Sequence, residues 1–132
     1  MNFTTDYRLE NFILETQWAD IPAPAQERLR GCMLDLLGAL VAGSGSGQFA
    51  AGLALARRAF RSGDIPVIGA ADTFDFLGAS AAMGHASNAY DIDDGHNIIR
   101  AHPGTSFIGG LLAAGYERDL NAQDFLAALY VS

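Results

Sequence analysis

Apolar residues recur at the spacing of an α-helix along almost the whole of this sequence. Between Pro24 and Gly43, leucine and methionine stand three or four residues apart, at positions 29, 33, 36, 37 and 40. Residues at this spacing share one face of a helix, so the segment predicts a helix that buries one side. Similar patterns predict further helices over 9–16, 49–60 and 74–90, from Thr105 or Ser106 onward, and after Asn121.

Only one segment, Ile65–Gly69, reads as a strand, and it is too short to found a sheet. We therefore predict an all-α helical bundle, with residues 1–132 forming a single helical domain. The last apolar pattern reaches Ser132 without a glycine, a proline or a basic final turn. Because these are the usual stop signals of a helix, we expect the chain to be part of a longer helical domain, cut within its last helix.

The segments between the helices carry their own predictions. Asp72 or Thr73 is placed to cap the helix over 74–90, and Asn121 with Asp124 three residues later resembles a capping box. The glycine-serine run 43–47 predicts a flexible turn. Three arginines near residue 60 predict a solvated helix end, where cations suit the helix dipole. The many Ala, Gly and Ser residues of 74–90 predict close approach of neighbouring helices.

Composition and charge exclude several classes of function. Half of the residues are apolar and 17% are charged, and no apolar run reaches the roughly 18 residues of a membrane span. The acidic, polar N-terminus matches neither a signal nor a transit peptide, so we expect a cytoplasmic protein without a membrane partner. A net charge of −7 argues against binding nucleic acid. The one cysteine, Cys32, lies in an apolar helical pattern and is expected to be a buried, inert thiol.

Titratable residues are concentrated between Asn88 and Ser106, in the run NAYDIDDGHNIIRAHPGTS. Acidic loops between helices are common, and each of these residues taken alone fits a structural role. Together they suggest more, because three neighbouring aspartates repel one another unless something uses or neutralises their charge. The spacing fails the calcium-loop pattern, since Gly95, His96 and His102 occupy the positions that need Asp or Asn, Gly and Glu. Two aspartates with two histidines leave open a transition-metal site.

Acid–base chemistry is the other function that this run supports. Histidine titrates near neutrality, and an adjacent carboxylate fixes its tautomer. His102 precedes Pro103 and a helix start, where free N–H groups attract an anionic substrate. His85 stands apart in the Ala-rich helix and is expected to be a packed histidine that makes one hydrogen bond. All eight basic residues are arginine, so no lysine of this chain can act as a base or form a Schiff base.

These motifs resemble those of a known family. The run NAYDIDDGH…AHPG is similar to the MmgE/PrpD signature, which is close to A-H-A-L-D-F-D-D-T…H-P-G. The opening LETQWADIPAPAQERLRGCMLDLLGALVAG resembles the first two helices of the family, with its W-x-D-[IL]-P and D-x-L-G-x-x-x-A-G elements. PVIG and LNAQDFLAALYVS also fall where the family has related segments. The resemblance covers nearly the whole chain and implies the N-terminal part of the family's helical domain.

The resemblance also implies an activity. Known members dehydrate 2-methylcitrate, decarboxylate cis-aconitate or epimerise iminodisuccinate, and they need no cofactor and no metal. Carried over to this chain, Asp91 and His102 are the catalytic positions. The family's threonine after D-F-D-D is Gly95 here, which removes a hydroxyl that binds a substrate carboxylate. His96 and Arg100 are the residues placed to replace that contact.

Three functions follow from these patterns. The first is a lyase or isomerase, with dehydration as the expected reaction, that acts on a small carboxylate and forms a homo-oligomer. Further active-site groups of the family, including a lysine and another histidine, lie beyond this sequence, so the isolated chain is expected to be inactive. The second is a non-catalytic helical scaffold that associates without turning anything over. The third is an unrelated metal-binding helical protein.

Overall fold

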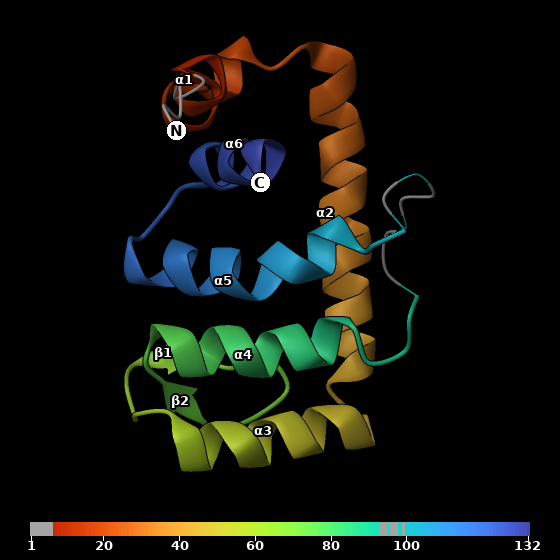
Figure 1. The fold of residues 1–132 in the computed structure, drawn as a ribbon, viewed down its shortest axis with the longest axis vertical. Helices are drawn as coiled ribbons and strands as arrows, with labels where there is room; N and C mark the ends of the chain where they lie inside the picture. The colour runs from red at the N-terminus through yellow and green to blue at the C-terminus, as the bar shows by residue number, and fades with distance from the viewer. Residues whose placement is uncertain (1–6, 93–94, 96–97, 99) are drawn as a thin grey trace, which may run out of the picture.

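The computed structural model describes residues 7–92, 95, 98 and 100–132 (Figure 1). Helices dominate these residues, which confirms the predicted all-α class. In chain order the elements are the helix α1 (Tyr7–Glu15), the 3₁₀ turn η1 (Trp18–Asp20), α2 (Ala23–Gly43), α3 (Gly47–Ala59), the strands β1 (Ile65–Pro66) and β2 (Thr73–Phe74), α4 (Phe76–Ser87), α5 (Pro103–Glu117) and α6 (Ala122–Val131).

Four helices lie one above another, and the long helix α2 runs across their ends (Figure 1). The order in this stack is α3, α4, α5 and α6, and each helix contacts the next one. Helix α4 lies in the middle and contacts α2, α3 and α5. Its side chains Ala79, Ala82, Met83 and Ala86 are buried in the hydrophobic core, together with Leu40 of α2.

Small residues bring α4 and α5 unusually close, as the composition of α4 predicts. A Cβ atom added at Gly109 of α5 would lie 2.4 Å from the carbonyl oxygen of Ser80 in α4. Only glycine leaves room for that approach, since real Cβ atoms do not come this near a carbonyl. The tight contact packs the middle of α5 directly on the backbone of α4.

Helices α3, α4 and α6 each begin with a side-chain cap. Ser46 accepts a hydrogen bond from the backbone N–H of Phe49, so part of the glycine-serine run predicted as a flexible turn caps α3 instead. Asn121 accepts from the backbone N–H groups of Gln123 and Asp124, which confirms the predicted cap of α6. Helix α4 is capped by Asp75, which accepts from the N–H of Gly78, and the prediction of Asp72 or Thr73 is wrong.

Asp72 has a different partner. It accepts two hydrogen bonds from Arg57 of α3, one from Nε at 2.8 Å and one from an Nη atom at 2.7 Å. This pair ties the turn between β1 and β2 to the end of α3. Arg57 remains 56% exposed in the last turn of α3, as the predicted solvated helix end requires, and it has Asp72 as an additional partner. The hydrogen bonds from Arg57 lower the pKa of the Asp72 carboxyl below its ordinary value, and the Coulomb attraction of the guanidinium adds to this effect.

The prediction that Cys32 of α2 is buried is wrong. Cys32 is exposed, because α2 packs along one narrow side and leaves much of its surface uncovered.

No single helix in the described part of the chain is long and apolar enough to cross a membrane. Helices α2 and α3, bent by 83° at their junction, pass that test together by length and composition.

Candidate functional site

His102 is held at the start of α5 by its own chain neighbours. Pro103 is the first helical residue, a position that suits its fixed φ and missing N–H. Proline also restricts the backbone of the residue before it, and His102 adopts φ −107° and ψ 85°. The hydroxyls of Thr105 and Ser106 donate hydrogen bonds to the carbonyl oxygen of His102, at 3.0 and 3.2 Å. These two residues therefore stabilise the first turn of α5. The predicted helix start at Thr105 or Ser106 is wrong, because α5 already begins at Pro103.

Asp91 reaches His102 from the other end of the loop. Helix α4 ends at Ser87, and Asp91 follows with φ 55°, a left-handed conformation that aspartate tolerates better than most residues. Its Oδ1 atom lies 3.0 Å from Nε2 of His102, so the structure brings together the two residues that the sequence predicts to be catalytic. The Asp91 side chain is 79% exposed and that of His102 is 35% exposed. A dissolved substrate can therefore reach the pair.

Gly95 lies against the ring of His102. A Cβ atom added at Gly95 would come 3.9 Å from Cε1 of His102, which is an ordinary van der Waals contact. The edge of the imidazole that faces Gly95 consequently has room for a small side chain or for part of a substrate. Arg100 is exposed and has φ 50°, and His96, the other residue predicted to bind substrate, lies outside the described residues.

The Asp91–His102 pair can hold and move a proton. A carboxylate within hydrogen-bond distance of one ring nitrogen orients the imidazole. Such a pair supplies an acid and a base within reach of one substrate atom.

Among the described residues, no group of three His, Cys, Asp or Glu side chains is placed to hold a metal. Asp93, Asp94 and His96 lie outside the described part, so the metal-binding alternative stays a prediction.

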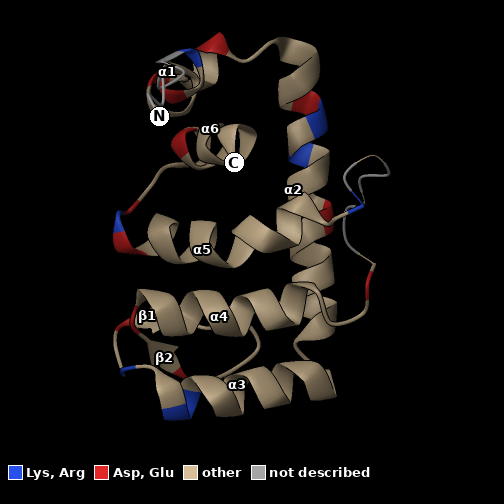
Figure 2. Cartoon of the chain, viewed as in Figure 1, with Lys and Arg blue, Asp and Glu red and all other residues tan. Residues whose placement is uncertain are grey.

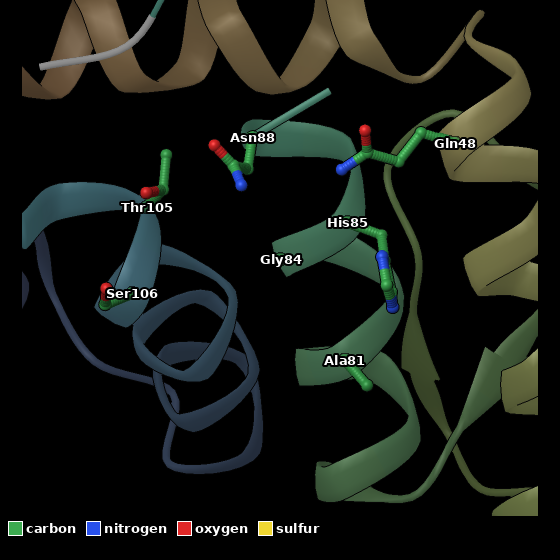
Figure 3. Close-up of a pocket in the computed structure, with 7 residues that line it drawn as sticks. All are labelled: Gln48, Ala81, Gly84, His85, Asn88, Thr105 and Ser106. Atoms are coloured by element: carbon green, nitrogen blue, oxygen red, sulfur yellow. The ribbon is translucent and has the colours of Figure 1, made fainter. Parts of the chain in front are cut away.

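A polar pocket that the sequence does not predict lies beside this pair (Figure 3). Its volume is about 370 Å³, and it is open to solvent between α3, α4 and the first turn of α5. The lining residues are Gln48, Ala81, Gly84, His85, Asn88, Thr105 and Ser106. His85 is half-buried and makes no hydrogen bond within the described residues, so the expected single hydrogen bond is absent there. The signal in the sequence is the pair His85 and Asn88, polar residues one helical turn apart in an apolar helix.

The comparison with known families covers nearly the whole chain. The sequence model of the MmgE/PrpD N-terminal domain matches residues 7–132. No curated protein and no solved structure matches the chain.

Proposed function

Because the chain belongs to the MmgE/PrpD family, we propose that it carries part of a cofactor-independent lyase or isomerase site for di- or tricarboxylates. The observation that supports this proposal most is the 3.0 Å approach of Asp91 Oδ1 to His102 Nε2. Proton transfer at a carbon next to a carboxylate needs an acid or base whose position and protonation are controlled. A histidine fixed between a proline and a carboxylate meets both requirements.

In this proposal His102 moves the proton and Asp91 holds its imidazole. In a dehydration, the C–H bond next to a carboxylate breaks, its electron pair forms the new C=C bond, and the hydroxyl on the neighbouring carbon leaves as water after receiving a proton. His102 serves either as the base of the first step or as the acid of the last. Asp91 stabilises the imidazolium in both cases. Residues 1–132 contain no lysine, so the proposed chemistry uses none from this sequence.

The chain's net charge of −7 repels an anionic substrate at long range, so nearby cationic or N–H donors must hold it at short range. Arg100 is the described cation nearest in sequence to His102, and its exposed position two residues before it suits that role. The first turn of α5 adds the positive end of a helix dipole.

The test uses the natural protein, isolated as the cell makes it with a tag at the chromosomal locus. Purified protein is supplied separately with 2-methylcitrate, cis-aconitate and iminodisuccinate. Formation of a C=C bond is followed by ultraviolet absorbance, release of CO₂ by a coupled assay, and epimerisation by chiral chromatography. Turnover of any one substrate supports the proposal and identifies the reaction. Absence of turnover with all three, in protein that remains folded, would favour the non-catalytic scaffold.

Association is the second property that we propose, and exposed apolar residues of α2 favour it. Leu34 and Val41 are 74% and 58% exposed and lie two helical turns apart on the same face. Gly38 stands between them with no neighbouring atom within 4 Å of an added Cβ, so a second helix has room to approach. A second copy of the chain presents the same apolar residues, as a two-fold dimer requires. Light scattering should give a dimer, and Leu34→Glu with Val41→Glu should give a monomer. Ala50→Glu with Ala54→Glu, which adds the same charge on the exposed side of α3, should leave the dimer intact.

A further inference from the structure

We propose that the polar pocket beside α4 binds a carboxylate of a small hydroxy-acid, and that it anchors the end of the substrate remote from the Asp91–His102 pair. This inference rests on the proposed function for the identity of that substrate. Three features of the pocket support it: the charge of the lining, the hydrogen-bonding groups that have no partner in the described chain, and the short distance to the pair.

The lining suits an anion. None of its seven residues is Asp, Glu, Lys or Arg, although the chain as a whole is strongly acidic. Figure 2 shows that α4 carries no charged residue and that the charges of α3 and α5 lie away from the ends that meet at the pocket. A carboxylate entering here meets no fixed negative charge in the lining. It also meets the first turn of α5, where the helix dipole favours negative charge.

Three side chains direct unused hydrogen-bonding groups at this space. Gln48, His85 and Asn88 make no side-chain hydrogen bond within the described part of the chain, and all three line the pocket. The Gln48 side chain extends from α3 toward the end of α4, and the Asn88 side chain extends from that end toward Thr105 (Figure 3). His85 lies on α4, one turn before Asn88. Amide and imidazole N–H groups are good donors to a carboxylate, so these residues can satisfy both of its oxygens.

The position of His85 depends on a glycine in the neighbouring helix. A Cβ atom added at Gly52 of α3 would lie 2.5 Å from Cγ of the His85 ring. The imidazole therefore packs directly on the α3 backbone, which restricts its motion and holds it at the edge of the pocket. A preorganised donor loses less conformational entropy on binding than one that moves freely.

The two hydroxyls of α5 explain why a hydroxy-acid fits better than a simple carboxylate. Thr105 and Ser106 already donate their hydrogens to the carbonyl of His102. Their oxygens therefore offer only lone pairs to the pocket and can accept a hydrogen bond from a ligand hydroxyl. The pocket presents donors on the α4 side and acceptors on the α5 side, and a hydroxy-carboxylate complements both.

One molecule can reach the pocket and the pair together. Asn88 precedes Asp91 by three residues, and three extended residues span at most about 11 Å. On the other side, Thr105 hydrogen-bonds the backbone of His102 itself. A di- or tricarboxylate held by one carboxylate in the pocket thus has its remaining carbons near the proton-transfer pair. The pocket contacts lie away from the reacting carbon, so they bind the ground state and the transition state equally and act mainly on KM.

The test is a binding measurement by NMR on the purified chain. Citrate is titrated while the Cε1–H signals of the histidines are followed, with tricarballylate, which lacks the hydroxyl, and inorganic sulfate in parallel. We expect a saturable shift of the His85 signal with citrate, weaker binding of tricarballylate and no saturation with sulfate. Equal effects of citrate and sulfate would overturn the assignment to a hydroxy-acid. A shift of His102 without His85 would overturn the pocket while leaving the proposed function intact.

Variants separate the pocket from the pair. Gln48 and Asn88 are exposed, so Gln48→Ala and Asn88→Ala should fold normally and weaken citrate binding roughly tenfold each, as expected for a lost hydrogen bond to a charged group. Gln123→Ala, an exposed glutamine of α6 outside the pocket, is the matched control and should bind citrate unchanged. His102→Asn should retain citrate binding. In the natural enzyme, Gln48→Ala should raise KM with little change in kcat, and unchanged binding in both amide variants would refute the pocket.

Discussion

The imidazole of His102 lies with Nε2 3.0 Å from Oδ1 of Asp91, although the two residues occupy opposite ends of the segment that joins α4 to α5. The left-handed backbone of Asp91 and the proline after His102 hold the two ends in this arrangement. Because both backbones are restrained, the Asp91–His102 contact has a defined geometry. A single substitution of either side chain removes it.

Removing either member should abolish most turnover in the natural protein. His102→Asn should lower kcat by roughly 10²–10⁴-fold, the range for losing a general acid or base. The free energy of unfolding should change by less than about 1 kcal/mol, as for other changes in an exposed loop. Asp91→Asn should lower kcat because the imidazolium loses its carboxylate. Steady-state kinetics and thermal unfolding measure the two effects separately.

Asp119→Asn is the matched control for Asp91→Asn. Asp119 is also exposed and also has a positive φ, at 50°, but it lies at the far end of α5. The backbone effect of exchanging Asp for Asn in a left-handed conformation should be the same at both sites. Equal kinetic losses in the two variants would mean that Asp91 acts through the backbone and not through its contact with His102.

Local patterns in the sequence predict much of this fold, and long-range contacts account for what they miss. The apolar spacing of α2 and the Asn121 cap of α6 are properties of adjacent residues, and the structure confirms both. Asp72 fits the pattern of a helix cap, but Arg57, fifteen positions earlier, takes its carboxylate, and Asp75 caps α4 instead. The exposure of Cys32 depends on which helices cover α2, and its neighbours in sequence carry no information about that.

The candidate site shows the same contrast between residues that a sequence motif links and residues that only packing brings together. Asp91 and His102 are found from sequence because a motif links them, and the pocket is missed because α3, α4 and α5 contribute to it separately. Gln48 is the clearest case. It stands in the first turn of α3 with no motif around it, and only the packing of α3 on α4 places it in the same pocket lining as Asn88.

Gly95→Thr should be tolerated and should alter substrate preference. The added Cβ meets Cε1 of His102 at an ordinary 3.9 Å, and the backbone of Gly95 is not left-handed. The free energy of unfolding should stay within about 0.5 kcal/mol of the parent. The new hydroxyl beside His102 offers a hydrogen bond to a substrate carboxylate, so kcat/KM ratios among 2-methylcitrate, cis-aconitate and iminodisuccinate should shift several-fold. Gly95→Ala, which adds the methyl without the hydroxyl, should leave the ratios as they are in the parent.

The Arg57–Asp72 pair should make stability depend on acid. The pKa of Asp72 is lower in the folded chain than its ordinary value of 3.8, so the folded state binds fewer protons than the unfolded state. The contribution of the pair is therefore present above that ordinary value and is lost as pH falls through the lower folded value. Asp72→Asn should melt at a lower temperature than the parent near neutral pH, and the difference should disappear in strong acid. Glu27→Gln, which removes the exposed carboxylate of the Arg30 pair within α2, should show a smaller difference. A difference for Asp72→Asn that persists unchanged in acid would show that the pair's charge is not its source.

Two adjacent glycines of α5 should respond in opposite directions to the same substitution. Gly109→Ala places a methyl group 2.4 Å from the Ser80 carbonyl oxygen, so α4 and α5 must separate, and overpacking of this kind costs about 1–3 kcal/mol. At Gly110 nothing lies within 4 Å of the added Cβ, and alanine is the better helix former by up to about 1 kcal/mol, so Gly110→Ala should stabilise the chain. Because the pocket and the Asp91–His102 pair both depend on where α5 begins relative to α4, Gly109→Ala should also weaken citrate binding, whereas Gly110→Ala should leave it unchanged. Chemical denaturation with the NMR titration tests both effects, and destabilisation of equal size at the two positions would mean that helix propensity, and not the approach of α4 to α5, determines the result.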